Sequence, residues 1–254
     1  MRNIIIKHDK LEFYEDEELL ICDNQIMFKK NGDYVLEYQD CFSVNLDIVV
    51  LDDCLVKLLV FGCDNKDIKI STHYSLGSRS NLILFGFYYN FKVNEETVVD
   101  LNGEFSKFSL GFSSISKGSL EYHIIVNHNH HHVESNISNK CIGLDGSSIK
   151  MQIDSVLEKG NIDCVMDQNT RILTLGDVNA EVIPNMFISE DSVEARHGSV
   201  IGGINSEDVF YLMSRGISLE EAVMLLIKGF IFSNLVVDMD KRAKIIQVIQ
   251  DLRR

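Results

Sequence analysis

Four histidines lie close together in the segment VNHNHHHVE. If this segment forms a β-strand, alternate side chains point to the same side, which places His128, His130 and His132 on one face. Three imidazoles on one face are able to bind zinc or a similar metal ion. The alternative is an exposed turn, which is favoured because Glu134 is the only nearby carboxylate that could orient the imidazoles. The segment therefore predicts either a histidine metal site or a solvated turn.

His197 is the only histidine in the last 122 residues, and it lies in the segment SVEARHGSVIG. On a strand, Val193 and Ala195 share a face with His197, so the histidine belongs to the more apolar side. Two roles fit this position: a hydrogen-bonded residue of the core, or a ligand. The first is more common for a histidine on an apolar face.

Motifs for nucleophilic catalysis and phosphate binding are absent from the sequence. There is no G-x-S-x-G and no G-x-x-x-x-G-K-[ST], and the segment GLDGSS has turn glycines without the lysine of a phosphate loop. The six cysteines are scattered, with no CxxC pair. We interpret most of them as small buried residues in a reducing compartment.

Composition limits the partners and the location. The net charge of -14 repels phosphate backbones, which argues against nucleic acid as a partner. Hydrophobic residues make up 45% of the chain, but no apolar run approaches the roughly 20 residues of a membrane-spanning helix. The N-terminus resembles neither a secretory signal nor a transit peptide. We therefore expect a cytoplasmic protein that does not bind membranes.

The elements that must position these histidines are mostly strands. From about residue 3 to residue 204 the chain consists of short apolar segments such as DIVVLDD, VKLLVFG and NLILFGF, separated by Asn, Asp, Gly and Ser. A sandwich, a barrel and a β-helix all fit this pattern. Successive strands of similar length with short turns favour a stacked β-helix. Pro184, the only proline, predicts an edge strand or a bulge, because it has no backbone donor.

After Gly203 the apolar period becomes that of a helix. INSEDVFYLMSRG predicts a short helix capped by Asn205 and Ser206. ISLEEAVMLLIKGFI predicts a second helix, since Ser218 and Glu221 have the spacing of a capping box, and MDKRAKIIQVIQDLRR predicts an amphipathic terminal helix. The predicted apolar faces are Ala222, Leu225, Leu226 and Gly229 in the second helix, and Ile245, Ile246, Val248, Ile249 and Leu252 in the third.

These patterns divide the chain into two parts. We predict a mainly β body over residues 1–204 and a small helical domain over residues 205–254. About 50 residues of short helices have little core of their own, so their apolar faces are expected to pack on the body or on another protein.

The region around the junction resembles a known protein family. The run VEARHGSVIGGINSEDVFYLMSRGISLEEAVMLLIKGFI is similar to the C-terminal signature of the SufB/SufD family of iron-sulfur cluster assembly proteins, in which a His-Gly or His-Glu pair precedes FYL-x-SRGI-x-x-x-EA. The similarity covers about residues 128–232, and residues 1–127 agree only in their β-rich character. The residues that match at the expected spacing are Phe210, Tyr211, Leu212, Ser214, Arg215, Gly216, Ile217, Glu221 and Ala222.

The resemblance implies a right-handed parallel β-helix with a helical C-terminal domain. In this family, SufB and SufD pair through the ends of their β-helices, and each docks a SufC ATPase with its C-terminal helices. It implies a noncatalytic subunit of a complex that builds a transient iron-sulfur cluster at a shared interface, with no cofactor firmly bound to the isolated chain. The residues expected to bind the SufC-like partner are Phe210, Tyr211, Arg215, Gly216, Glu221 and Leu225.

Two departures from the SufB pattern favour a SufD-like member. SufB-type scaffolds carry a cysteine six residues before the glycine of their LLIG strand, and counted from Gly176 that position is Thr170. SufB proteins usually follow the motif histidine with Glu, whereas Gly198 follows it here. The resemblance then implies that His197 is an accessory cluster ligand facing a SufB cysteine.

Other interpretations stay open. The chain could be a SufB-like scaffold that forms a homodimer with SufC, pairing with a second copy of itself rather than with a SufB-like paralog. A β-helix carbohydrate enzyme, or a metal protein using His128, His130 and His132, belongs to a different class and is disfavoured because clustered catalytic residues are not visible. The chain is also shorter than typical family members, so we expect it to lack their N-terminal helical domain.

Overall fold

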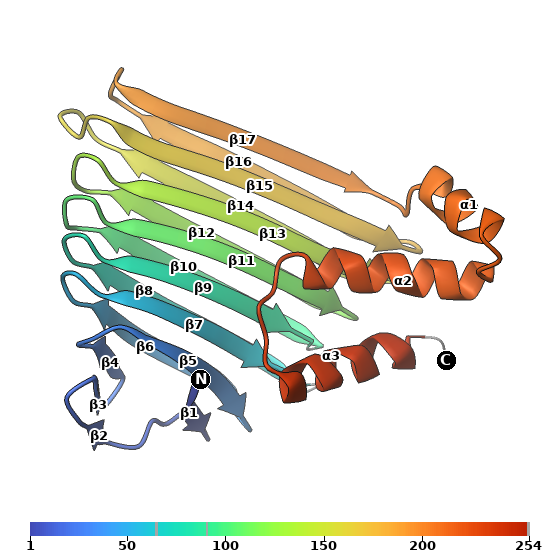
Figure 1. Cartoon of the computed structure of the whole chain (residues 1–254), viewed down its shortest axis with the longest axis horizontal. Helices are drawn as coiled ribbons and strands as arrows, with labels where there is room; N and C mark the ends of the chain where they lie inside the picture. The colour runs from blue at the N-terminus through green and yellow to red at the C-terminus, as the bar shows by residue number, and fades with distance from the viewer. Residues whose placement is uncertain (64–65, 90, 253–254) are drawn as a thin grey trace.

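The computed structural model describes residues 1–63, 66–89 and 91–252. Its strands wind into a parallel β-solenoid of about six turns, followed by three helices (Figure 1). The first sheet, called sheet A, contains β1 (Arg2–Lys7), β5 (Gly32–Gln39), β7 (Leu55–Gly62), β9 (Asn81–Tyr88), β11 (Lys107–Ser116), β13 (Glu134–Leu144), β15 (Cys164–Leu175) and β17 (Val193–Gly202), in that order. The second, called sheet B, contains β2 (Tyr14–Glu15), β3 (Leu19–Cys22), β4 (Gln25–Phe28), β6 (Ser43–Val50), β8 (Asp67–Leu76), β10 (Lys92–Leu101), β12 (Ser119–His128), β14 (Ser148–Leu157) and β16 (Asn179–Ile188).

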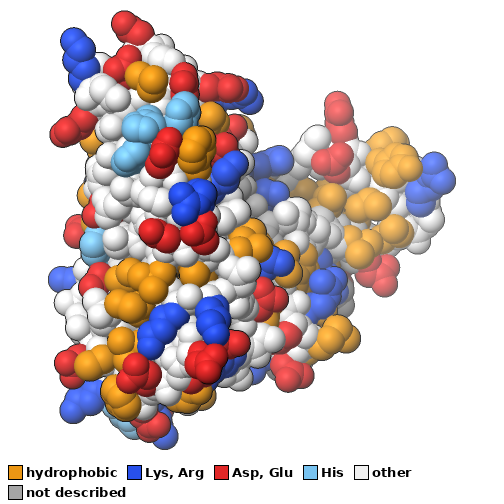
Figure 2. Space-filling model, turned by 60° about the vertical axis from the view of Figure 1, so that its left-hand side comes forward, with side chains coloured by type: hydrophobic (Ala, Val, Ile, Leu, Met, Phe, Trp, Pro, Cys, Tyr) orange, Lys and Arg blue, Asp and Glu red, His pale blue; other side chains and the backbone are white. Residues whose placement is uncertain are grey.

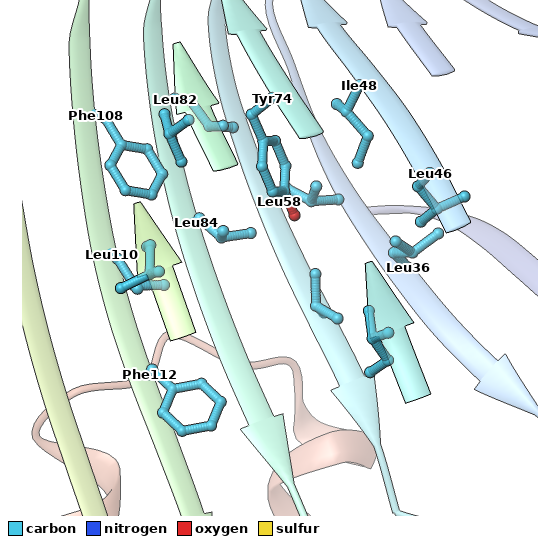
Figure 3. Close-up of a cluster of buried hydrophobic side chains, with 14 of the residues drawn as sticks. Leu36, Leu46, Ile48, Leu58, Tyr74, Leu82, Leu84, Phe108, Leu110 and Phe112 are labelled. Carbon is cyan, nitrogen blue, oxygen red and sulfur yellow. The ribbon is translucent and has the colours of Figure 1, made fainter. Parts of the chain in front are cut away.

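Alternating burial along the strands explains why the chain folds this way. In β8, β10 and β12 every second side chain is buried, which is the pattern of strands with one face toward a core. Neighbouring strands pair in parallel with a constant register, so each inward-facing side chain lies next to an inward-facing side chain of the adjacent strand. The two sheets therefore enclose one continuous apolar core. Figure 3 shows side chains of this core, such as Leu46, Tyr74 and Leu84, lying between the strands. The predicted β-helix is confirmed.

Pro184 lies in β16, which is the last strand of sheet B. An edge strand leaves its backbone donors on one side unused, so the missing N–H of proline is tolerated there, as predicted.

Cysteine burial also agrees with the sequence analysis. Cys41, Cys54, Cys141 and Cys164 are buried and none of the cysteines in the described part of the chain forms a disulfide.

The three helices are α1 (Ser206–Ser214), α2 (Leu219–Phe232) and α3 (Met239–Asp251). Asn205 caps α1 by accepting from the backbone of Glu207, and Ser218 forms the predicted capping box with Glu221 at the start of α2. Arg253 and Arg254, the end of the predicted terminal helix, lie outside the described residues. Within the described residues, no helix combines the length and the apolarity needed to cross a membrane.

A second apolar core joins α2 and α3 to the outer face of sheet A. Five outward side chains of the sheet supply one side of it, and the helices supply the other. In α2 the packing residues are Ala222, Met224, Ile227 and Ile231, whereas Leu225 points to solvent. Of the predicted apolar face, Ala222 is buried and Leu226 is partly buried, whereas Leu225 and Gly229 are exposed and do not pack on the body. The five side chains from the sheet are Phe61, Phe87, Ile115, Ile142 and Leu173.

The connection between α2 and α3 sits directly on sheet A. The side-chain amide of Asn234 donates to the carbonyl oxygens of Phe112 at 2.9 Å and Ser138 at 2.6 Å. Gly111 makes room for this approach, because a Cβ there would lie 2.3 Å from the carbonyl oxygen of Asn234. Lys241 of α3 is buried and pairs with Glu37 of β5, which fixes the start of the last helix.

Candidate functional site

The solenoid ends on β16 and β17, which have no further strand beyond them in the described chain. We call this the open end (top of Figure 1). The side chains that continue the interior columns here, including Val182 and Met186, are only partly buried although they pack on the core. Phe187 is 57% exposed and Ile201 45% exposed. The open end therefore presents apolar surface and two strand edges with free backbone groups.

His197 lies on β17 in register with Gln168 of β15, whose side chain is 2% exposed. Gln168 points into the solenoid, where its amide nitrogen donates to Ser155 at 2.7 Å and to the carbonyl oxygen of Asn185 at 3.2 Å. His197 thus continues the column of inward-facing side chains that includes Gln168. This agrees with the prediction that His197 shares the more apolar face of its strand with Ala195. Its side chain is nevertheless exposed, because no strand of the described chain follows β17 in sheet A.

The structure therefore gives His197 no role as a hydrogen-bonded core residue. Among the described residues, no side chain or backbone group forms a hydrogen bond or ion pair with it. An exposed imidazole at the end of an inward-facing column can accept a ligand or a partner group from outside the chain. Its role as a cluster ligand stays a prediction.

Thr170 occupies the position where SufB-type scaffolds carry cysteine. It is buried, lies two residues after Gln168 on the same inward face, and accepts a hydrogen bond from Asn139 at 3.1 Å. Its neighbour across the ladder is Ser199 of β17. No thiolate is therefore supplied at this point of the open end by this chain.

The four clustered histidines do not share a strand face. β12 ends at His128, whose side chain is 1% exposed and faces the core. Its Nδ1 lies 3.1 Å from the carbonyl oxygen of Val156 and its Nε2 lies 2.9 Å from Ser135 Oγ. Burial lowers the pKa of His128 to about 4, so this imidazole is neutral at physiological pH. Both of its nitrogens are used within the fold.

His130, His131 and His132 lie in the turn after β12. His132 has a positive φ of 58° and stacks on Phe105, and its Nδ1 lies 3.7 Å from Asp163. His131 Nε2 lies 3.4 Å from Glu104. Figure 2 shows a group of histidine side chains with acidic ones beside it on the solenoid surface. The predicted common face of His128, His130 and His132 is wrong, because the strand ends before the last two.

No group of three or more His, Cys, Asp or Glu side chains within residues 1–63, 66–89 and 91–252 is placed to hold a metal ion. The turn histidines instead pair with carboxylates and an aromatic ring of neighbouring turns. This arrangement corresponds to the solvated turn that the sequence analysis favoured.

The residues expected to bind a partner lie on α1, α2 and the turn between them. No residue of α1 is buried, Phe210 is 74% exposed and Tyr211 is 58% exposed. The other exposed large apolar side chains of the two helices are Met213, Leu219 and Leu225, and we call the five together the α1–α2 apolar face. Figure 2 shows hydrophobic side chains gathered where the molecule projects beside the solenoid.

The other three expected partner residues have structural roles in the same region. Arg215 lies over the ring of Tyr211 and ends α1. Gly216 has a positive φ of 85°, which glycine adopts without strain, and it turns the chain between the helices. The Glu221 carboxylate accepts from Ser218, which orients the start of α2. These three residues shape the chain next to the α1–α2 apolar face.

Residues 34–230 match the model of the family described as "SUF system FeS cluster assembly, SufBD core domain". The chain belongs to the SufB/SufD family. The match begins within β5 and ends near the end of α2, so it includes β17 with His197, all of α1 and most of α2, and leaves out β1–β4 and α3.

Curated relatives of this SufB/SufD chain are similar over short segments. An iron-sulfur cluster assembly SufBD family protein of Pyrococcus horikoshii is 33% identical over 98 residues, which is 37% of this chain and 21% of the relative. The SufD protein of Bacillus subtilis is 37% identical over 76 residues, covering 30% and 17%. The SufB protein of the same organism is 34% identical over 76 residues, covering 29% and 15%. The matched segments therefore span about a fifth or less of these relatives.

Several polar groups were missed by the sequence analysis. Asp154 accepts from His123 at 2.8 Å and from Asn185 at 2.8 Å on the outer face of sheet B. His73 lies between Asp47 at 3.0 Å and Asp100 at 2.8 Å on the same face. These residues are far apart in the chain but lie at matching positions of neighbouring strands. They could have been paired from the sequence only if the number of residues in one turn of the solenoid had been known.

Proposed function

We propose that this chain is a SufD-like, noncatalytic subunit of a cytoplasmic SufBCD-type scaffold. It pairs with a SufB-like partner through the open end and docks a SufC-like ATPase on the α1–α2 apolar face. The observation that carries the proposal is an apolar, uncapped end of the solenoid with an exposed histidine on its last strand. An iron-sulfur cluster is the cargo of the complex and is assembled at the shared interface.

The SufD-like assignment depends on two positions. Identity to the SufD and SufB proteins of Bacillus subtilis is nearly the same, at 37% and 34%, and does not separate them. The absence of a thiol at Thr170 and the presence of Gly198 after His197 support SufD. His197 then assists a thiolate that the partner supplies, since thiolates are the usual ligands of iron-sulfur clusters.

Docking of the ATPase is tested on the α1–α2 apolar face. Phe210→Asp is expected to abolish co-purification with the SufC-like ATPase encoded in the same genome, because it places a charge in the centre of the apolar contact. Phe13→Asp is the matched control, since Phe13 is 70% exposed at the opposite end of the solenoid. If the wild-type chain does not bind the ATPase, the docking proposal is wrong.

The role of His197 is tested separately. His197→Ala is expected to lower cluster assembly by the reconstituted complex, followed by the visible absorbance of the cluster, while complex formation is unchanged. His8→Ala, an exposed histidine near the N-terminus, serves as the control. Unchanged assembly by His197→Ala would exclude the ligand role.

A SufB-like homodimer with the ATPase is the second candidate. It is favoured by the same open end, because two copies of an uncapped edge can pair about a twofold axis. Native mass spectrometry of the chain with the ATPase, with and without a SufB-like protein, separates the two. A stable complex containing two copies of this chain, unchanged by added SufB-like protein, supports the homodimer.

A further inference from the structure

Two basic side chains stand side by side on the outer face of sheet A, next to the helices. Lys140 of β13 and Arg171 of β15 are direct partners in the parallel ladder, so their side chains project to the same side. With Leu173, Leu225 and Phe230 they line a pocket of about 310 Å³ between the sheet and the helices. The pocket thus combines two positive charges on its sheet side with apolar side chains of α2, and the polar residues Asn205 and Asp208 at the start of α1 are also part of its lining.

Neither cation forms an ion pair with another residue that the structure describes. Among the described residues, no carboxylate lies within ion-pair distance of Lys140 or Arg171. Lys140 donates to Ser233 Oγ at 2.6 Å, and both cations lie near the ring of Phe230, at 5.7 and 5.8 Å from its centre. Burial and the charge of Arg171 together lower the pKa of Lys140. Two adjacent, uncompensated cations favour an incoming anion.

The pocket is continuous with the α1–α2 apolar face. Leu225 belongs to that face and also lines the pocket, so a protein that covers Leu225 lies over Lys140 and Arg171 as well. Asp208 of α1 also lines the pocket but forms no ion pair with either cation, and the whole chain carries a net charge of -14. Both features disfavour a free, multiply charged anion and fit a single carboxylate held by a partner of complementary shape.

We propose that the pocket receives an Asp or Glu side chain of the docked ATPase, clamped between Lys140 and Arg171. The inference rests on the proposed docking of a SufC-like ATPase. Burial of Phe230 and Leu225 at the interface contributes affinity for the ATPase. The charge-assisted hydrogen bonds to the carboxylate fix its orientation. The two cations then set the angle at which the ATPase sits on the helices.

The experiment measures the Kd of the SufC-like ATPase for the full chain at low and at high salt. The variant Lys140→Gln with Arg171→Gln keeps most of each side-chain stem and removes both charges. We expect its Kd to rise at least tenfold at low salt and the difference from wild type to shrink at high salt. The control is Lys69→Gln with Lys92→Gln, which removes two charges from exposed positions of sheet B and is expected to leave the Kd unchanged.

A second variant separates charge from packing. Lys140→Arg with Arg171→Lys exchanges the two cations and is expected to bind far more tightly than the double glutamine variant. If the wild type binds the ATPase and Phe210→Asp abolishes binding, but the double glutamine variant binds like wild type, the clamp is refuted while the docking proposal stands. If the wild type itself does not bind, the docking proposal fails first.

Discussion

Glu95 is a carboxylate in the interior of the solenoid. It lies on an inward position of β10, between Ile70 and Tyr122 in the neighbouring strands, and is 8% exposed. Thr97 donates to its Oε1 at 2.9 Å, and its Oε2 has no hydrogen-bond partner among the described residues. Burial raises the pKa of Glu95 from 4.5 to about 7. The folded protein therefore binds the proton of the Glu95 carboxyl group more tightly than the unfolded chain does.

This difference makes stability depend on pH in a defined direction. Because the folded pKa is the higher one, the cost of ionising Glu95 is absent well below pH 4.5, grows as the pH rises, and is complete above pH 7. Since a tenfold change in proton affinity corresponds to about 1.4 kcal/mol, the pKa values of 4.5 and about 7 give a full cost of about 3 kcal/mol. At pH 5.5 the ionisation of Glu95 costs the folded state about 1 kcal/mol.

Glu95→Gln removes the ionisable group and keeps its shape. We expect the variant to be more stable than wild type by about 3 kcal/mol at pH 8 and by about 1 kcal/mol at pH 5.5. Urea denaturation at the two pH values gives both free energies of unfolding, and comparing variant with wild type at each pH cancels the titration of other groups. The control is Glu96→Gln, the exposed neighbour on the outer face. An equal effect of Glu95→Gln at both pH values would refute the reasoning.

Two further predictions concern the helices and the outer face of sheet B. Asn234→Ala removes two hydrogen bonds to sheet A, and we expect a loss of about 2 kcal/mol with faster amide exchange in α2 and α3, measured by mass spectrometry. Burial lowers the pKa of His73, but hydrogen bonds with Asp100 and Asp47 outweigh this and raise it above its ordinary value. The stabilising contribution of His73 is therefore present below its ordinary pKa and lost as the pH rises, so His73→Gln should destabilise more at pH 6 than at pH 9.

Local patterns predicted the elements well. Alternation of apolar and polar residues identified strands because each has one buried face, and the caps at Asn205 and Ser218 marked helix starts because they satisfy nearby backbone groups. The packing face of α2 could not be predicted in this way. Apolar residues occur nearly all round this helix, and the partner surface on sheet A, including Phe61 and Phe87, comes from distant turns of the solenoid.

The candidate site was predicted in part for the same reason. The inward orientation of His197 follows from alternation along one strand, but its exposure depends on the absence of a following strand in the described chain. The histidine-rich segment was harder, because the strand ends at His128 and the positive φ of His132 belongs to a turn. Glu95 was missed altogether, since the segment VNEETVVD contains three acidic residues and does not reveal that this one faces inward.

The two ends of the solenoid differ in a way that bears on assembly. At the N-terminal end, sheet A finishes in the six-residue parallel strand β1, whereas in sheet B β2 and β3 turn back antiparallel, so that this sheet finishes in a two-residue strand. At the open end, β16 and β17 are ten residues long and parallel to their neighbours. Short and reversed edge strands resist pairing with another chain, whereas long regular ones favour it. This asymmetry supports association through the open end, where the partner would cover His197 and the inward column that it continues.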